Sequence, residues 1–144
     1  MRFTYRPGTR TGLLVAAAVL VPVLSGLAAG CSSSTPAYCT AAASLKTSVS
    51  DLGNVDVAKN GLGSLQTALT SVTSNAKMFA ADAGSAFAPQ TTALQNSLSG
   101  LQSAINSAKS QPSVTAATAV ASSVTQVKSS ASALQSAVSG SGKC

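Results

Sequence analysis

Apolar residues recur along this chain at alternating spacings of three and four, and the pattern holds in four separate runs. A 3.5-residue repeat of this kind keeps one stripe of a helix facing its neighbours, as in coiled coils and helix bundles. Ser, Thr, Gln, Asn and Lys fill the positions between, which suits solvated faces. The four runs are Tyr38, Ala42, Leu45, Val49 and Leu52; Leu62, Leu65, Leu69, Val72, Ala76, Phe79 and Ala83; Leu94, Leu98, Leu101, Ile105 and Ala108; and Ala117, Val120, Val124, Val127, Ala131, Leu134 and Val138.

Helix-terminating residues separate the four runs. The segment 53–56 follows the first run, and Asp56 is placed to cap the second helix. Gly84 and Ser85 follow the second run, and Pro89 suits the first turn of a third helix. A polar segment, 110–113, divides the third run from the fourth. These breaks predict four helices joined by short connections.

The predicted fold is all-α, an antiparallel up-down four-helix bundle. The alternative has three helices, with 84–89 acting only as a kink in one long central helix. Many seam positions are Ala, so the predicted core is thin and would benefit from a covalent link. Gly100 lies inside the third run, where we expect it to permit close helix approach at a cost of about 1 kcal/mol relative to Ala.

The N-terminus has the features of a secretory signal. Arg2, Arg6 and Arg10 carry positive charge, and an apolar run of about 13 residues, 12–24, follows them. This run is short for a membrane span, which needs about 20 residues. Small residues then fill 25–30. We therefore expect residues 1–30 to be a signal peptide.

The stretch Ala28-Ala29-Gly30-Cys31 resembles the lipobox of bacterial lipoproteins. The resemblance implies that the Cys31 thiol is lipidated and becomes the first mature residue. The expected location is then the outer face of the cell membrane, with 31–37 as a lipid-anchored tether rich in Ser, Thr and Pro and 38–144 as the helical bundle. The alternative is ordinary cleavage after Gly30, which would release a secreted protein.

The chain has three cysteines, so two remain to form a disulfide if one of them carries lipid. If Cys31 is the lipidation site, Cys39 and Cys144 remain, one at each end of the bundle. Export to an oxidising compartment favours a disulfide between them. In an up-down bundle, only an even number of helices brings the two ends together, so this bond favours four helices over three.

Composition excludes several function classes. The whole chain has a net charge of +6, but without the three signal arginines it has six Lys against three Asp, a net charge of +3 with no cluster. A nucleic-acid partner is therefore not expected. The chain has no His and no Glu, which removes most general acid–base and metal-binding groups. We expect no enzyme activity, no catalytic or cofactor-binding residue and no metal site.

The layout also resembles small exported helical-bundle lipoproteins of Gram-positive bacteria, through Tyr38-Cys39, Cys144 and the stretch 87–98. Such families have no assigned activity. The resemblance and the missing chemistry favour a structural or interaction role, with an envelope protein or the cell wall as partner. A second hypothesis is a small-molecule or lipid-binding bundle, with Phe79 and Phe87 lining a pocket. A third is self-association as a coiled coil, although an intrachain disulfide favours a monomer.

Overall fold

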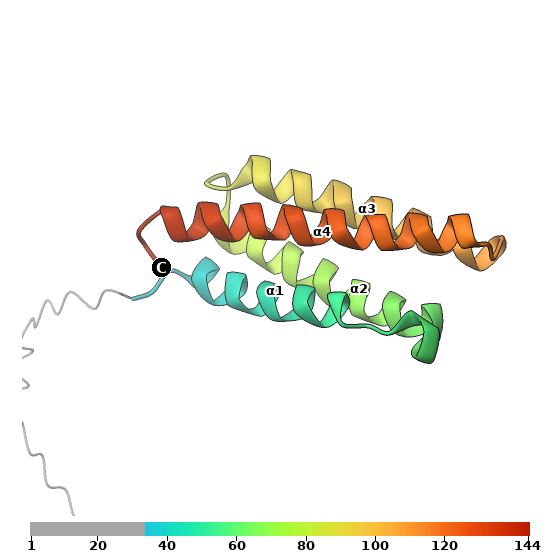
Figure 1. Cartoon of the computed structure of the whole chain (residues 1–144). Helices are drawn as coiled ribbons and strands as arrows, with labels where there is room; N and C mark the ends of the chain where they lie inside the picture. The colour runs from blue at the N-terminus through green and yellow to red at the C-terminus, as the bar shows by residue number, and fades with distance from the viewer. Residues whose placement is uncertain (1–33) are drawn as a thin grey trace, which may run out of the picture. The chain divides into compact units, whose positions relative to one another are not determined.

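Four helices account for most of residues 34–144, the part of the chain that the computed structural model describes (Figure 1). They are α1 (Ala37–Gly53), α2 (Val57–Ala83), α3 (Ala88–Ser110) and α4 (Val114–Gly140), and this part contains no strand. The predicted all-helical fold with four helices is confirmed. The three-helix alternative is wrong, because a turn at 84–87 separates α2 from α3. The predicted signal peptide, 1–30, and Cys31 lie outside the described residues.

The helix ends follow the local signals in the sequence. Asp56 caps α2, because its Oδ1 atom accepts hydrogen bonds of 3.1 Å from the backbone N–H groups of Ala58 and Lys59. Gly84 follows the last residue of α2, and Pro89 occupies the first turn of α3. The predicted breaks between the helices are therefore present.

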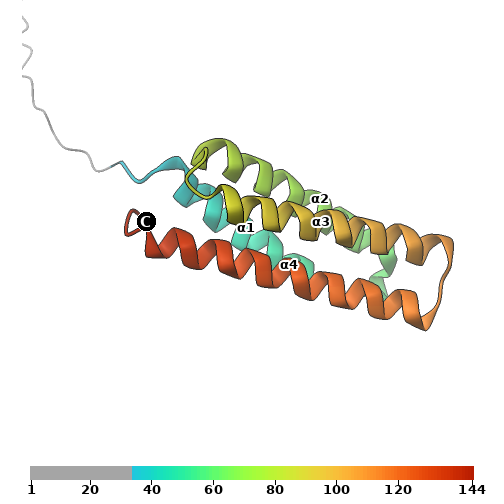
Figure 2. The same ribbon diagram turned by 90° about the horizontal axis from the view of Figure 1, so that it is seen from above.

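Each helix packs against two others. The closest pairs are α1 with α2 and α3 with α4, and contacts of α1 with α4 and of α2 with α3 complete the ring. Figures 1 and 2 show the α1–α2 and α3–α4 connections at one end of the bundle. The α2–α3 connection and the C-terminus lie at the other end.

The core follows the four apolar stripes. Large side chains such as Leu45, Leu94 and Ile105 are almost completely inaccessible to solvent. The three aromatic rings of this part of the chain, those of Tyr38, Phe79 and Phe87, meet with centroids 5.4–6.4 Å apart. Phe79 and Phe87 are buried in this cluster, where they fill space between the ends of α1, α2 and α3. Neither lines the grooves described below.

The structure differs from the sequence-based expectation in the fourth apolar stripe and at Gly100. Ala117 is exposed and Val124 is only half-buried, although both continue the fourth apolar stripe. Gly100 is exposed on α3, and a Cβ atom added there would meet nothing within 4 Å. It therefore serves no close helix approach, because its position between Leu98 and Leu101 turns it away from the stripe.

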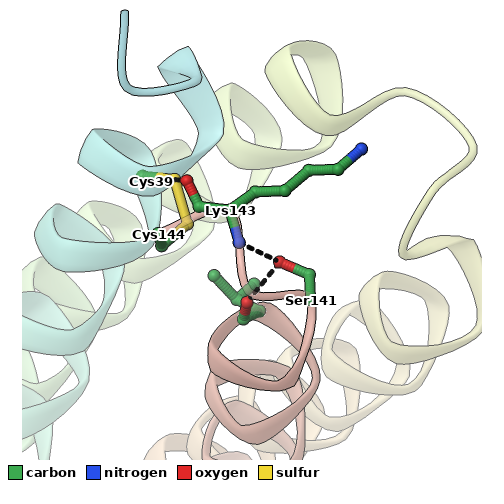
Figure 3. The surroundings of a disulfide bond; sticks show 5 residues. Cys39, Ser141, Lys143 and Cys144 are labelled. Carbon is green, nitrogen blue, oxygen red and sulfur yellow. Dashed lines mark hydrogen bonds between the residues drawn. A yellow bond between two sulfur atoms is a disulfide. The ribbon is translucent and has the colours of Figure 1, made fainter. Parts of the chain in front are cut away.

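A disulfide bond between Cys39 and Cys144 joins the first turn of α1 to the segment after α4 (Figure 3). The Cα atoms lie 5.6 Å apart, within the usual range for such a bond. Ser141 turns the chain, since its hydroxyl donates to the Val138 carbonyl at 2.6 Å and accepts from the Lys143 N–H at 3.4 Å. The bond therefore closes a covalent ring around the whole bundle.

Removing this bond should destabilise the bundle. The two cysteines are 105 residues apart, and opening a loop of that length costs up to about 5 kcal/mol in the chain-entropy description. We expect the double variant Cys39→Ser/Cys144→Ser to show a lower free energy of unfolding in urea, followed by circular dichroism. The Cys31→Ser variant is the control and should unfold like the parent. Equal urea midpoints for the double variant and the control would contradict the stabilising role.

Candidate binding groove

A half-open groove of about 510 Å³ lies at the end of the bundle that carries the α1–α2 and α3–α4 connections. Its volume lies within the range of about 300–1,000 Å³ that is typical of small-molecule sites. Fifteen residues line it, and most are apolar, so the groove offers an aliphatic surface to a ligand. The apolar members are Leu52, Val55, Val57, Leu62, Leu65, Ala108, Pro112, Ala117, Val120, Ala121 and Val124.

Unequal helix lengths explain why the groove is there. Helix α1 has 17 residues and α4 has 27. The ten extra residues correspond to about 15 Å of helix, and Figure 1 shows α4 continuing past the end of α1. Along that length α4 has no α1 side chains against it. Ala117 consequently faces the groove, and Val124 lines the groove while it also packs against the edge of the core.

The connection between α1 and α2 forms one wall of the groove. Val55 and Val57 contribute half-buried side chains, and Asp56 holds this segment by capping α2 and pairing with Lys59 at 3.4 Å. Helix α2 then kinks at Gly61, which has φ 72° and ψ 175°. This backbone conformation is open to glycine and costly for other residues. The kink therefore allows the first turn of α2 to take a different direction from the rest of the helix.

Four lining residues are not apolar side chains: Gly53, Ser113, Thr125 and Lys128. The Thr125 hydroxyl donates to the Ala121 carbonyl at 3.1 Å, and the Ser113 hydroxyl accepts from the Ala116 N–H at 3.1 Å. Lys128 is exposed, and its side chain lies over Gly53, 3.3 Å from the place a Cβ atom would take. Among the described residues, Lys128 therefore brings the one positive charge in the groove lining, and no carboxylate lies there.

The cysteines identified from the sequence do not contribute to the groove. Cys39 and Cys144 lie at the opposite end of α1 and are bonded to each other, and Cys31 is outside the described residues. The groove was not predicted. The signal that could have indicated it is the length of the apolar runs, because the first run covers 38–52 whereas the fourth covers 117–138.

A second depression, of about 480 Å³, lies between α2 and α3, with Thr73, Lys77, Gln95, Ser99 and Gln102 among its lining. The groove at the end of the bundle is the more apolar of the two. Within 34–144, no three His, Cys, Asp or Glu side chains gather closely enough to hold a metal ion. None of the helices in this range is both long enough and apolar enough to cross a bilayer.

Comparison of the chain with protein-family models, with curated proteins and with solved structures finds no match. A function for this chain is therefore inferred from the groove and its chemistry.

Substitution at the kink should damage the wall of the groove. We expect Gly61→Ala to lower the free energy of unfolding by about 1–3 kcal/mol, because alanine strongly disfavours the φ and ψ found there. The control is Gly100→Ala at an open helical position, which should raise the free energy of unfolding by about 0.5–1 kcal/mol. Urea unfolding of both variants measures the difference. A stabilising effect of Gly61→Ala would mean that α2 is not kinked there.

Proposed function

We propose that this chain is an exported, lipid-anchored protein that binds an apolar ligand outside the cytoplasm and catalyses no reaction. The observation that carries the proposal is the groove, which is half-open, of ligand size and lined mainly by aliphatic side chains. The absence of His and Glu from the whole chain supports binding rather than catalysis. Binding at such a surface draws its free energy from removing apolar area from water.

The proposed arrangement assigns a task to each part of the chain. Residues 1–30 are the signal peptide, Cys31 carries the lipid, 31–37 is the tether, and the rest is an antiparallel up-down bundle. The tether joins the bundle at the start of α1, while the groove lies past the other end of α1. The ligand site is therefore separated from the point of attachment by about 25 Å, the length of a 17-residue helix.

A contact with an envelope protein or with the cell wall is the second candidate function. The observation that favours it is Val114, which follows the groove residue Ser113 and has 86% of its surface exposed. An exposed valine beside an apolar groove extends the apolar surface beyond what a small ligand covers. In this alternative the bundle remains a monomer, held closed by its intrachain disulfide.

Binding can be measured with Nile red, an uncharged apolar dye that fluoresces in apolar surroundings. The full-length chain carrying Cys31→Ser, which cannot be lipidated, should show saturable binding at one site. Ala121→Phe places a ring in the groove and should weaken that binding about tenfold or more. Ala119→Phe is the matched control, on the same helix and exposed but outside the groove lining.

The control should bind the dye as the parent does, with unchanged circular dichroism in both variants. Dye binding that is absent, or that is the same in both phenylalanine variants, would overturn the groove as the binding site.

Lipid anchoring is tested by the intact mass of the chain purified from its native membrane. We expect a mass that begins at Cys31 and exceeds the polypeptide mass by a lipid moiety. Alkylation without reduction should modify no thiol, because Cys39 and Cys144 are bonded and Cys31 is lipidated. A chain recovered from the medium without lipid would replace anchoring with secretion.

A further inference from the structure

We propose that the groove takes an anionic single-chain amphiphile, such as a fatty-acid carboxylate, with its tail on the aliphatic lining and its head group on Lys128. This inference rests on the proposed binding function and specifies the ligand class.

The dimensions of the groove favour one chain over a protein partner. The lining residues on α4 extend from Ala117 to Lys128. These two residues are eleven positions apart, so the α4 segment that lines the groove is about 16 Å long. This is an elongated channel, suited to a flexible hydrocarbon tail lying along the helix. A stable protein interface needs about 20–30 residues on each side, whereas fifteen line this groove. A second copy of the chain is therefore a poorer fit than a small amphiphile.

The polar groups of the groove favour a negatively charged head. The Thr125 hydroxyl already donates to the backbone of α4, and the Ser113 hydroxyl accepts from that backbone at the far end of the groove from Lys128. In the described part of the chain, 34–144, the amino group of Lys128 forms neither a hydrogen bond nor an ion pair. The lining contributed by these residues contains no carboxylate that would repel an anion. A lysine ammonium group and a carboxylate form a charge-assisted hydrogen bond, which is stronger than one between neutral groups.

Lys128 also has a structural explanation, namely that it neutralises the end of α1. Its amino group lies close to Gly53, where the helix dipole is negative. However, three carbonyls at the end of α1 already accept hydrogen bonds, since the Asn54 N–H bonds to Ser50 and Asp51 and the Val55 N–H bonds to Leu52. The ammonium group forms no hydrogen bond in the described part of the chain, so its three donors are available to a ligand, and the negative end of the α1 dipole favours its place near Gly53.

The position of Lys128 gives the ligand a direction. Gly53 and Lys128 mark the end of the groove nearer the middle of the bundle, whereas Pro112 and Ala117 lie at the α3–α4 connection. A carboxylate at Lys128 therefore directs the tail along α4 toward that connection. On the way, the tail would contact the aliphatic α4 side chains that line the groove: Val124, Ala121 and Val120.

Three amphiphiles with the same tail and different head charge test this assignment: dodecanoate, dodecanol and dodecyltrimethylammonium. Each is titrated below its micellar concentration, at pH 8, against Nile red bound to the full-length Cys31→Ser chain. We expect dodecanoate to displace the dye at concentrations about tenfold lower than dodecanol, and the ammonium compound to be weakest. Lys128→Glu should reverse the order, so that the ammonium compound becomes the best competitor.

The matched control is Lys46→Glu, which makes the same change in net charge at an exposed position of α1 outside the groove lining. It should keep the preference for dodecanoate. A reversal in both variants would show that net charge alone sets the preference, and it would overturn the role of Lys128. Equal competition by dodecanoate and dodecanol would overturn the head-group assignment but leave the apolar site in place. Nile red that never binds saturably would overturn the groove and this inference together.

Discussion

The covalent closure between Cys39 and Cys144 is the constraint on which the other features of the bundle depend. Ten of the 21 buried apolar core residues are Ala or Val, so each helix buries a modest apolar area against its neighbours. Helices with so many Ser, Thr and Val residues also have little intrinsic stability and need tertiary contacts. The disulfide reduces the entropy of the unfolded chain and holds the start of α1 beside the end of α4.

The groove follows from this closure combined with helix length. With the start of α1 held beside the end of α4, its 17 residues reach only part of the way along that 27-residue helix. The connection to α2, which the Asp56 cap stabilises, covers the remaining face of α4 only in part. The groove thus lies where the bundle lacks about three turns of one helix. The aliphatic side chains that line it are only partly covered by other residues.

Much of the fold could be predicted because its determinants are local. The 3–4 spacing of apolar residues indicated four helices, and Asp56 and Pro89 marked helix starts by their own capping and backbone chemistry. The groove could not be read in the same way. The heptad pattern continues through Ala117 and Val124 whether or not another helix covers them. The exposure of these two residues depends on where α1 ends in the folded bundle. Lys128 likewise becomes part of the site only because its side chain lies close to Gly53 in the fold.

Methyl-labelled NMR spectra of the Cys31→Ser chain, recorded during titration with dodecanoate, test most directly whether an apolar ligand lies in the groove past the end of α1. We expect saturable shifts of the methyl groups of Val55, Leu62 and Val124, with those of Leu94 and Val138 unchanged because they lie in the core outside the groove. Shifts confined to Leu94 and Val138, or no shift at any methyl group, would contradict binding in the groove.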